Sequence, residues 1–191
     1  MYFPGESSWR VVVKKKVCLV GEGAVGKTSL IRRFVTDQFD DKYITTVGTK
    51  VTKKEIIAKD PTGVMNKVDM TIWDIMGQPG FRELLKQAYF YGAGGIIAVC
   101  DVTRKETFDA LEAWIEDVRN VVGDKSPIIF FGNKSDLDEK QVTQEDLDGI
   151  AAKHGSVSFL TSAKTGNFVE EGFLALAQEM LKSSGGSDGG E

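Results

Sequence analysis

The sequence predicts an α/β fold: a three-layer sandwich with a six-stranded, mostly parallel sheet, one antiparallel edge strand, and helices on both faces. Strand-like and helix-like segments alternate along the 191 residues, so most strands would be connected by helices that cross one face of the sheet. Only one neighbouring pair of strands is joined by a short turn, which predicts the antiparallel edge. A glycine-rich loop separates the first strand from the first helix, at a position where such folds bind ligands.

Six segments have the pattern of strands. The first, 11–20, is rich in β-branched residues, and 51–58 and 67–73 show alternating apolar residues. Between the latter two, the stretch 60–63 (Asp-Pro-Thr-Gly) has the composition of a hairpin turn. The remaining strands are short apolar segments, typical of buried strands: 95–100, 128–131 and 158–161.

Helical patterns cover the segments between these strands. They are 27–36, 81–91, 107–122, a helix that begins at Thr143, and 168–181. The glycines of 92–95 are expected to end the second of them. At the fourth, Asp146 follows Thr143 by three residues, which is close to a capping box with Asp in place of Glu.

The composition is that of an ordinary globular domain, with 41% hydrophobic and 27% charged residues. We expect a flexible segment over 1–10, one domain over 11–182 and a disordered Ser/Gly-rich tail over 183–191. The start has no signal-peptide pattern, no apolar run approaches the ~20 residues of a membrane span, and the tail has no prenylation cysteine. We expect a cytoplasmic monomer that reaches membranes through partner proteins, or through a lipid anchor if the native C-terminus extends beyond this tail.

Charge and rare residue types exclude several functions. A net charge of −4 argues against nucleic-acid binding, and the basic run 14–16 is expected to be a solvated strand entry rather than a membrane patch. Cys18 and Cys100 lie in apolar strands, which predicts buried free thiols and a reducing compartment. The only histidine, His154, is expected at a helix end, which argues against a Ser-His-Asp triad.

The strongest motif is a loop with the pattern G-x-x-x-x-G-K-[ST]. It comprises Gly21, Glu22, Gly23, Ala24, Val25, Gly26, Lys27 and Thr28, and we include Ser29 in the same site. Glycines let such a loop curl so that backbone N–H groups converge on phosphate oxygens, and the helix N-terminus adds partial positive charge. Lys27 supplies a full charge to the β- and γ-phosphates, and the Thr28 hydroxyl suits Mg²⁺. The strand before the loop and the helix after it favour nucleotide binding over a chance glycine-rich turn.

An acidic residue follows the strand over 67–73. Asp74, at a strand end beside a phosphate loop, can hold Mg²⁺ directly or through water, and Gly77 can offer its N–H to a terminal phosphate. Taken alone, Asp74 would be interpreted as a turn cap, but the neighbouring phosphate loop favours the metal role.

Two short polar motifs follow the last two strands: Asn133-Lys134-Ser135-Asp136 and Ser162-Ala163-Lys164. The Asp136 carboxylate can accept both N1–H and N2–H of guanine, a pair of donors that adenine lacks. Asn133 can reach guanine N7 or connect the loops, and the stem of Lys134 can cover a face of the base. The N–H of Ala163 can meet guanine O6. Their order after successive strands predicts a guanine site.

These motifs resemble those of the Ras-superfamily small GTPases, with most similarity to the Rab branch. The resemblance covers about 14–182 and five motifs in family order: 21–28, 46–48, 73–78, 133–136 and 162–164. It implies a Ras-like P-loop NTPase fold and a switch that binds GTP or GDP with Mg²⁺ and hydrolyses GTP slowly. It also implies effectors, exchange factors and activating proteins that recognise two nucleotide-dependent loops, in membrane trafficking or signalling.

The resemblance implies roles for single residues as well. Thr46, rather than its neighbour Thr45, would close switch I over the γ-phosphate and Mg²⁺. Gln78 would orient the attacking water, so that Lys27, Thr46 and Gln78 carry the catalysis. Phe39 would pack beside guanine, with an ordinary core residue as the alternative. The motifs supply no arginine finger in cis, which implies that a partner provides one.

The chain departs from the family pattern within and directly after the motif 73–78, in the second of the two nucleotide-dependent loops (switch II). Met76 stands where the family usually has alanine, and Pro79-Gly80 replaces the usual Glu-Arg or similar pair. We expect these changes to alter the hydrolysis rate or the choice of partner but not nucleotide binding. They leave open a nucleotide-bound scaffold with little hydrolysis. A different P-loop enzyme, such as a small-molecule kinase, does not explain 133–136.

Overall fold

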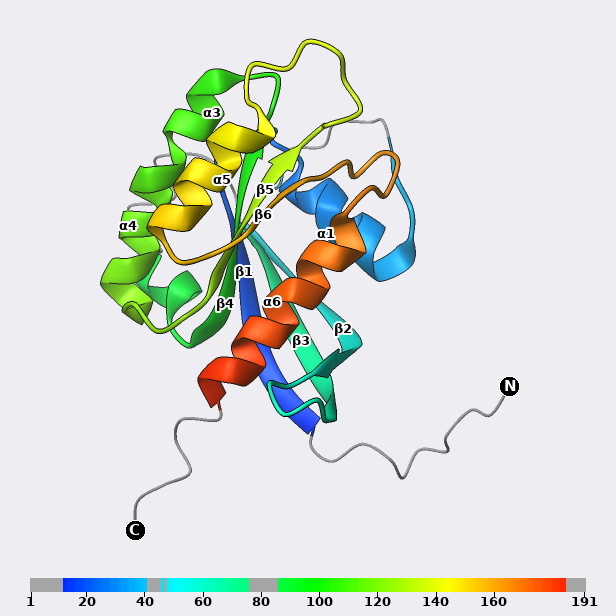
Figure 1. Cartoon of the computed structure of the whole chain (residues 1–191), viewed down its shortest axis with the longest axis vertical. Helices are drawn as coiled ribbons and strands as arrows, with labels where there is room; N and C mark the ends of the chain where they lie inside the picture. Colours follow the sequence, from blue (N-terminus) through cyan, green and yellow to red (C-terminus); the bar gives the residue numbers. More distant parts are fainter. Residues whose placement is uncertain (1–11, 41–45, 47, 76–85, 185–191) are drawn as a thin grey trace.

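A computed structural model of the chain describes residues 12–40, 46, 48–75 and 86–184. Six strands form one sheet in the order β2-β3-β1-β4-β5-β6 within this part of the chain (Figure 1). The strands are β1 (Val12–Val20), β2 (Thr49–Lys59), β3 (Met65–Ile75), β4 (Ala93–Asp101), β5 (Ile128–Asn133) and β6 (Ser158–Leu160). All pairs are parallel except β2 with β3, and β2 lies at an edge. The predicted sheet is confirmed.

Helices cover both faces of this sheet, as Figure 1 shows. Those with both ends described are α1 (Lys27–Thr36), α3 (Lys105–Asp109), α4 (Leu111–Val122), α5 (Gln144–Lys153) and α6 (Val169–Ser184). Residues 86–90, within the helix predicted over 81–91, are helical too, and 81–85 lie outside the described residues. The helices α1 and α6 contribute to one hydrophobic cluster, and α4 and α5 contribute to the other, on the opposite face. The predicted three-layer arrangement is therefore confirmed.

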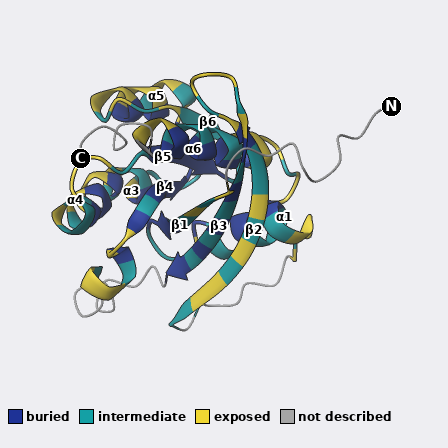
Figure 2. Ribbon diagram, turned by 90° about the horizontal axis from the view of Figure 1, so that it is seen from below, coloured by how far each residue is buried: buried dark blue, intermediate teal, exposed yellow. Residues whose placement is uncertain are grey.

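The central strands are apolar because both of their faces are covered. In β1, Val17 and Leu19 belong to the cluster under α1 and α6, and Cys18 and Val20 belong to the cluster on the other face. The yellow, exposed segments in Figure 2 lie on the outer sides of the helices and along β2. Because the central strands are packed on both faces, they fix the positions of the loops that follow the carboxyl ends of the parallel strands.

Several local predictions are confirmed. Cys18 and Cys100 are free and buried, and burial raises the pKa of each thiol to about 12. The stretch 60–63 is the turn of the β2–β3 hairpin. Thr143 caps α5 and forms a capping box with Asp146, and His154 is the C-cap of the same helix. No helix of the described residues combines the length and apolar character needed to cross a membrane.

Some predicted boundaries are wrong. The helix expected over 107–122 is two helices, α3 and α4, because ψ of Ala110 is −13° rather than the helical value of about −42°. Residue 93 already belongs to β4, where Ala93 pairs with Lys16 in the ladder with β1. Phe168 precedes α6 instead of starting it, because its φ of 51° is left-handed.

Two elements extend further along the chain than the sequence predicted. Helix α6 runs to Ser184, two residues past the boundary expected at 182. Similarly, β3 includes Asp74 and ends at Ile75, because its pairing with β2 extends to that residue. Residues 1–11 and 185–191, which contain the expected flexible segment and most of the tail, lie outside the described residues.

Candidate guanine-nucleotide site

The predicted site residues meet at one edge of the sheet. The phosphate loop follows β1, Asp74 lies near the end of β3, Asn133 ends β5, and 162–164 follow β6. These strands are parallel, so their carboxyl ends point the same way. Sequence segments more than a hundred residues apart are thus placed side by side without any long connecting loop.

Two glycines give the phosphate loop its tight path. Gly21 has φ of 139°, and a Cβ there would lie 2.1 Å from the carbonyl oxygen of Val99. Gly26 has φ of 99°, and a Cβ there would lie 2.2 Å from Asn133 Nδ2. A larger residue at either position would displace the loop from the sheet or from the base motif. The glycines of the pattern are therefore required by both backbone conformation and space.

Lys27 is the first residue of α1 and lies under this loop. The residue is 6% exposed, and Nζ donates to the carbonyl oxygens of Gly21 (2.7 Å) and Glu22 (2.8 Å). Burial lowers the pKa of Lys27 to about 8, although the carboxylates of Asp74 and Glu22 act in the opposite direction. A buried ammonium beside the N–H groups predicted to bind phosphate would strongly attract a phosphate oxygen.

This pKa predicts a pH dependence of nucleotide binding. Only the charged form of Lys27 attracts phosphate, and at pH values above the pKa of about 8 the free protein must take up a proton to bind. We expect the Kd for GDP to rise as pH increases above 8, by up to about tenfold per pH unit, and to change little below about 7. Titrations from about pH 6.5 to 9 would measure this. The Lys27→Met variant, which has no titrating amine, should show no such rise; equal slopes for both proteins would contradict the assignment.

Three oxygen-bearing side chains converge beside Lys27. Thr28 Oγ1 lies 2.8 Å from Thr46 Oγ1 and donates to Asp74 Oδ2 at 2.5 Å. Asp74 is 2% exposed, and in the described part of the chain its buried Oδ1 has no hydrogen-bond partner. Burial raises the pKa of Asp74, while the bond from Thr28 and the charge of Lys27 oppose this rise.

This donor set fits Mg²⁺. A hard divalent cation prefers oxygen ligands. A buried carboxylate oxygen normally has a hydrogen-bond partner or binds an ion, and Asp74 Oδ1 has no hydrogen-bond partner among the described residues. Among the described residues, no cluster of three or more His, Cys, Asp or Glu side chains is positioned to hold a metal ion. The sequence-predicted metal ligands Thr28, Thr46 and Asp74 are thus brought together.

Asn133 connects the phosphate loop to the last loop of the site. Its Nδ2 donates to the carbonyl of Val25 at 2.8 Å, and its Oδ1 accepts from the backbone N–H of Ala163 at 3.2 Å. The side chain is 1% exposed. Of the two roles considered for Asn133, the structure supports the connection of the loops. The N–H of Ala163, predicted to meet guanine O6, points to Asn133 here.

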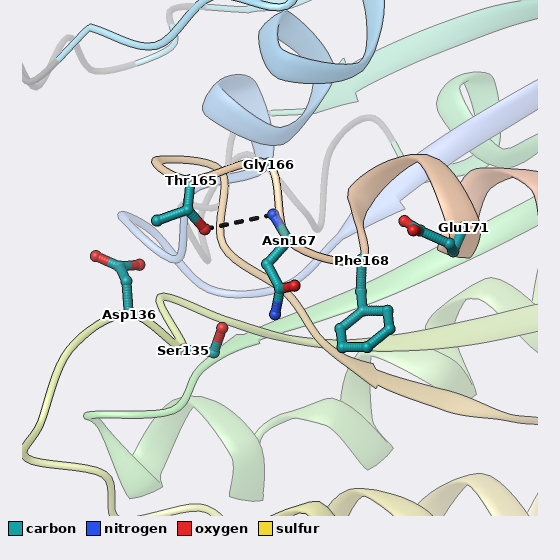
Figure 3. Close-up of a pocket in the computed structure, with 7 residues that line it drawn as sticks. All are labelled: Ser135, Asp136, Thr165, Gly166, Asn167, Phe168 and Glu171. Carbon is teal, nitrogen blue, oxygen red and sulfur yellow. Dashed lines mark hydrogen bonds between the residues drawn. The ribbon is translucent and has the colours of Figure 1, made fainter.

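Asp136 lies at an exposed rim of the same region. Its Oδ1 accepts from Ser162 Oγ at 2.6 Å, and the N–H of Thr165 in turn donates to Ser162 Oγ at 3.1 Å. A pocket of about 470 Å³ lies beside the carboxylate (Figure 3). It is lined by Ser135, Asp136, Thr165, Gly166, Asn167, Phe168 and Glu171. The bond from Ser162 fixes the orientation of Asp136 and leaves one lone pair of Oδ1 and the whole of the second oxygen to accept from a base.

Other site residues have no sequence motif. Arg33 of α1 donates from Nε to the carbonyl of Ala163 (2.8 Å) and from Nη2 to that of Lys164 (2.6 Å), which holds the last loop against α1. Trp114 of α4 donates from Nε1 to Glu22 Oε1 at 2.9 Å and so anchors the phosphate loop on the other side. Neither contact has a local sequence signal, because each joins elements about 90 or more residues apart.

For a few predicted site residues the structure gives the position, while their contact with the nucleotide stays a prediction. Phe39 is half-buried and packs against the cluster of α1 and α6, which agrees with the core alternative and leaves its base contact a prediction. Ser29 lies within α1, and Lys164 lies in the loop after β6. The remaining predicted site residues, Gly77 and Gln78, lie outside the described residues, as do Thr45, Met76, Pro79 and Gly80.

The fold and this loop define the class of protein: a P-loop nucleotide-binding domain. Comparison with known proteins narrows it. The chain matches the Ras family over residues 16–182. It is 36% identical to the Ras-related protein Rab-13 of Mesocricetus auratus over 178 residues, and this matched region covers 92% of this chain and 84% of the relative. It is also 36% identical to the Ras-related protein Rab-13 of Bos taurus over 172 residues, and this matched region covers 90% of this chain and 82% of the relative.

The chain therefore belongs to the Ras family, and it is a small GTPase that binds and hydrolyses GTP. The similarity to Rab proteins confirms the branch predicted from the motifs. The kinase alternative is thereby excluded, and the scaffold alternative is not favoured.

Proposed function

We propose that this small GTPase is a slow molecular switch that requires Mg²⁺ held by Thr28, Thr46 and Asp74. The observation that carries the proposal is the contact of these three side chains, with the orphaned Asp74 Oδ1, next to the buried ammonium of Lys27. When bound there, Mg²⁺ would neutralise charge on the β- and γ-phosphates.

The residues of the chain supply binding, orientation and charge. The N–H groups of residues 21–29 and the amine of Lys27 bind the phosphates, and Asp136 selects guanine, with Phe39, Lys134 and 162–164 around the base. Gln78 orients a water for in-line attack on the γ-phosphate, and Lys27 stabilises the charge that develops there. Catalysis of this kind depends mainly on positioning and on stabilisation of charge, and the motifs supply no arginine finger in cis, so intrinsic turnover is slow.

Switching follows from contacts that only the γ-phosphate can make. Thr46 and the N–H of Gly77 hold their loops in the GTP state and release them after hydrolysis. Effectors read these loops, an exchange factor replaces GDP, and an activating protein supplies the arginine that accelerates hydrolysis. We place this activity in membrane trafficking or signalling, with partner proteins providing the contact with membranes.

The Gln78→Leu variant tests the hydrolytic part of this proposal. Leucine has a similar volume but cannot hydrogen-bond a water, so GTP binding should persist while the single-turnover rate falls by at least about tenfold. Rates would be measured with purified protein, with and without Mg²⁺. Gln178→Leu, the same change in α6, is the matched control and should hydrolyse GTP at the wild-type rate. Equal rates for wild type and Gln78→Leu would exclude Gln78 as the water-positioning residue, and turnover unaffected by Mg²⁺ removal would exclude the metal site.

A further inference from the structure

The loop after β4 contains an arginine that belongs to none of the nucleotide motifs. Arg104 Nη2 donates to the carbonyl oxygen of Gly23 in the phosphate loop at 2.9 Å. Its Nε donates to Asp101 Oδ2 at 3.1 Å. The planar guanidinium can make both directed bonds at once, so one side chain connects the phosphate loop to the end of β4.

Asp101 extends this connection to the base motif. The same Oδ2 lies 2.6 Å from Lys134 Nζ, and Oδ1 accepts from the backbone N–H (3.0 Å) and hydroxyl (2.7 Å) of Thr103. Burial acts to raise the pKa of Asp101, but the bonds from Lys134 and Thr103 outweigh it and hold the pKa below its usual value. Asp101 is thus an ionised carboxylate, 1% exposed, whose oxygens are all engaged.

Strand pairing fixes the position of this carboxylate. Asp101 is the last residue of β4 and pairs with Asn133, the last residue of β5, directly before Lys134. The N–H of Val102 donates to the carbonyl of Asn133 at 3.0 Å, so the two strand ends cannot separate without breaking the sheet. Arg104, Asp101 and Lys134 therefore form a chain from the phosphate end of the site to the base end.

The electrostatics agree with this placement. The positive charge of Arg104 acts on Lys27 and contributes to the lowering of its pKa, after burial as the main cause. Arg104 is thus close enough to the phosphate-binding amine to influence it. Its own donors are directed at a protein carbonyl and a carboxylate, which is the arrangement of a residue that orients the site.

We propose that Arg104 is a positioning residue that joins the phosphate loop, through Asp101, to Lys134 and thereby slows the release of GDP. The proposal rests on the proposed assignment of residues 21–29 to phosphates and of Lys134 to the base. With Arg104 in place, movement of the phosphate loop away from GDP must break one of two charge-assisted bonds: the bond to the Gly23 carbonyl, or the bond to the carboxylate that also holds Lys134. Without it, the bond from Asn133 Nδ2 to the Val25 carbonyl still joins the two halves, but the phosphate loop loses its connection to Asp101 and Lys134.

Dissociation of a fluorescent GDP analogue in the presence of Mg²⁺ and excess GDP tests this. We expect Arg104→Ala to release the analogue about tenfold faster than wild type, because one charge-assisted contact at each end of the guanidinium is lost. Arg104→Lys should be intermediate, since one ammonium cannot reproduce the two-pronged geometry. Arg119→Ala is the matched control, because Arg119 likewise makes two hydrogen bonds within the protein, to the carbonyls of Gly123 and Ser126, but at the far end of α4. It should release the analogue at the wild-type rate.

A double variant separates this role from simple destabilisation. If both residues act through Asp101, the combined effect of Arg104→Ala and Lys134→Ala should be clearly smaller than the product of the single effects. Multiplying effects would overturn the proposed connection, as would a wild-type release rate in Arg104→Ala. If Arg104→Ala does not fold, Arg104→Lys and its double variant give the same comparison. Failure of the wild-type protein to retain the GDP analogue would instead count against the assigned nucleotide site.

Discussion

Replacement of Lys27 by methionine is expected to weaken GDP and GTP binding by about two to four orders of magnitude. The methionine keeps an unbranched stem of similar length in a position that is 6% exposed, so the loss is mainly of charge. Breaking a buried pair between charged groups costs about 3–5 kcal/mol, which is the origin of the expected change in Kd. Isothermal titration of the nucleotide-free protein with GDP would measure it.

The fold should survive this change. Burial lowers the pKa of Lys27 to about 8, which means that the folded protein without nucleotide holds the charged form at a cost in free energy. The circular dichroism spectrum of nucleotide-free Lys27→Met should match that of wild type. Lys153→Met in α5, where the lysine side chain is 70% exposed, is the control and should bind GDP normally. A Kd for Lys27→Met within about threefold of wild type would contradict the role of the lysine.

The fold was predictable because its signals are local. Apolar runs such as those that became β4 and β5 can be buried only in a sheet covered on both faces, and the single turn at 60–63 marks the one antiparallel pair. The errors lie at element ends. The division at Ala110 and the left-handed Phe168 depend on backbone angles that residue type does not determine, since neither is a glycine or a proline.

Within the site, the predicted residues are those whose chemistry and spacing form a motif. Thr28 and Asp74 are 46 residues apart, yet each was found from its place at the end of a strand or the start of a helix, and the two are in contact. Their position follows from the rule that parallel strands present their carboxyl ends together.

The residues that the sequence did not reveal act from outside the motifs. Arg33, Arg104 and Trp114 contact the site loops through side chains that cross between elements, and an arginine or tryptophan in a helix or loop has no distinguishing local pattern. For Asn133, the motif predicted the position but left two roles open, a contact with guanine N7 or a connection between the loops. The bonds that Asn133 makes to Val25 and Ala163 in the structure favour the connection. Such supporting contacts depend on tertiary geometry and require a structure.

Replacement of Asp136 by asparagine is expected to change which base the site accepts. The carboxylate can receive both N1–H and N2–H of guanine, whereas an asparagine offers one acceptor and one donor. The asparagine N–H would face the guanine amine, and two donors repel. We expect GDP to bind about a hundredfold to a thousandfold more weakly, as charge-assisted bonds contribute about 1.5–3 kcal/mol each.

The same geometry predicts that Asp136→Asn gains affinity for a xanthine nucleotide. Xanthine has a carbonyl where guanine has its amine, so it can accept from the asparagine N–H while its N1–H donates to the amide oxygen. The amide oxygen can also keep the bond that Ser162 Oγ makes to Oδ1 in the wild type. Xanthosine diphosphate should therefore bind Asp136→Asn more tightly than it binds wild type, and the order of the two nucleotides should reverse. Asp138→Asn, the same change two residues away at an exposed position, should leave both affinities unchanged. A variant that lost GDP affinity without gaining affinity for xanthosine diphosphate would indicate that Asp136 supports the loop rather than pairs with the base.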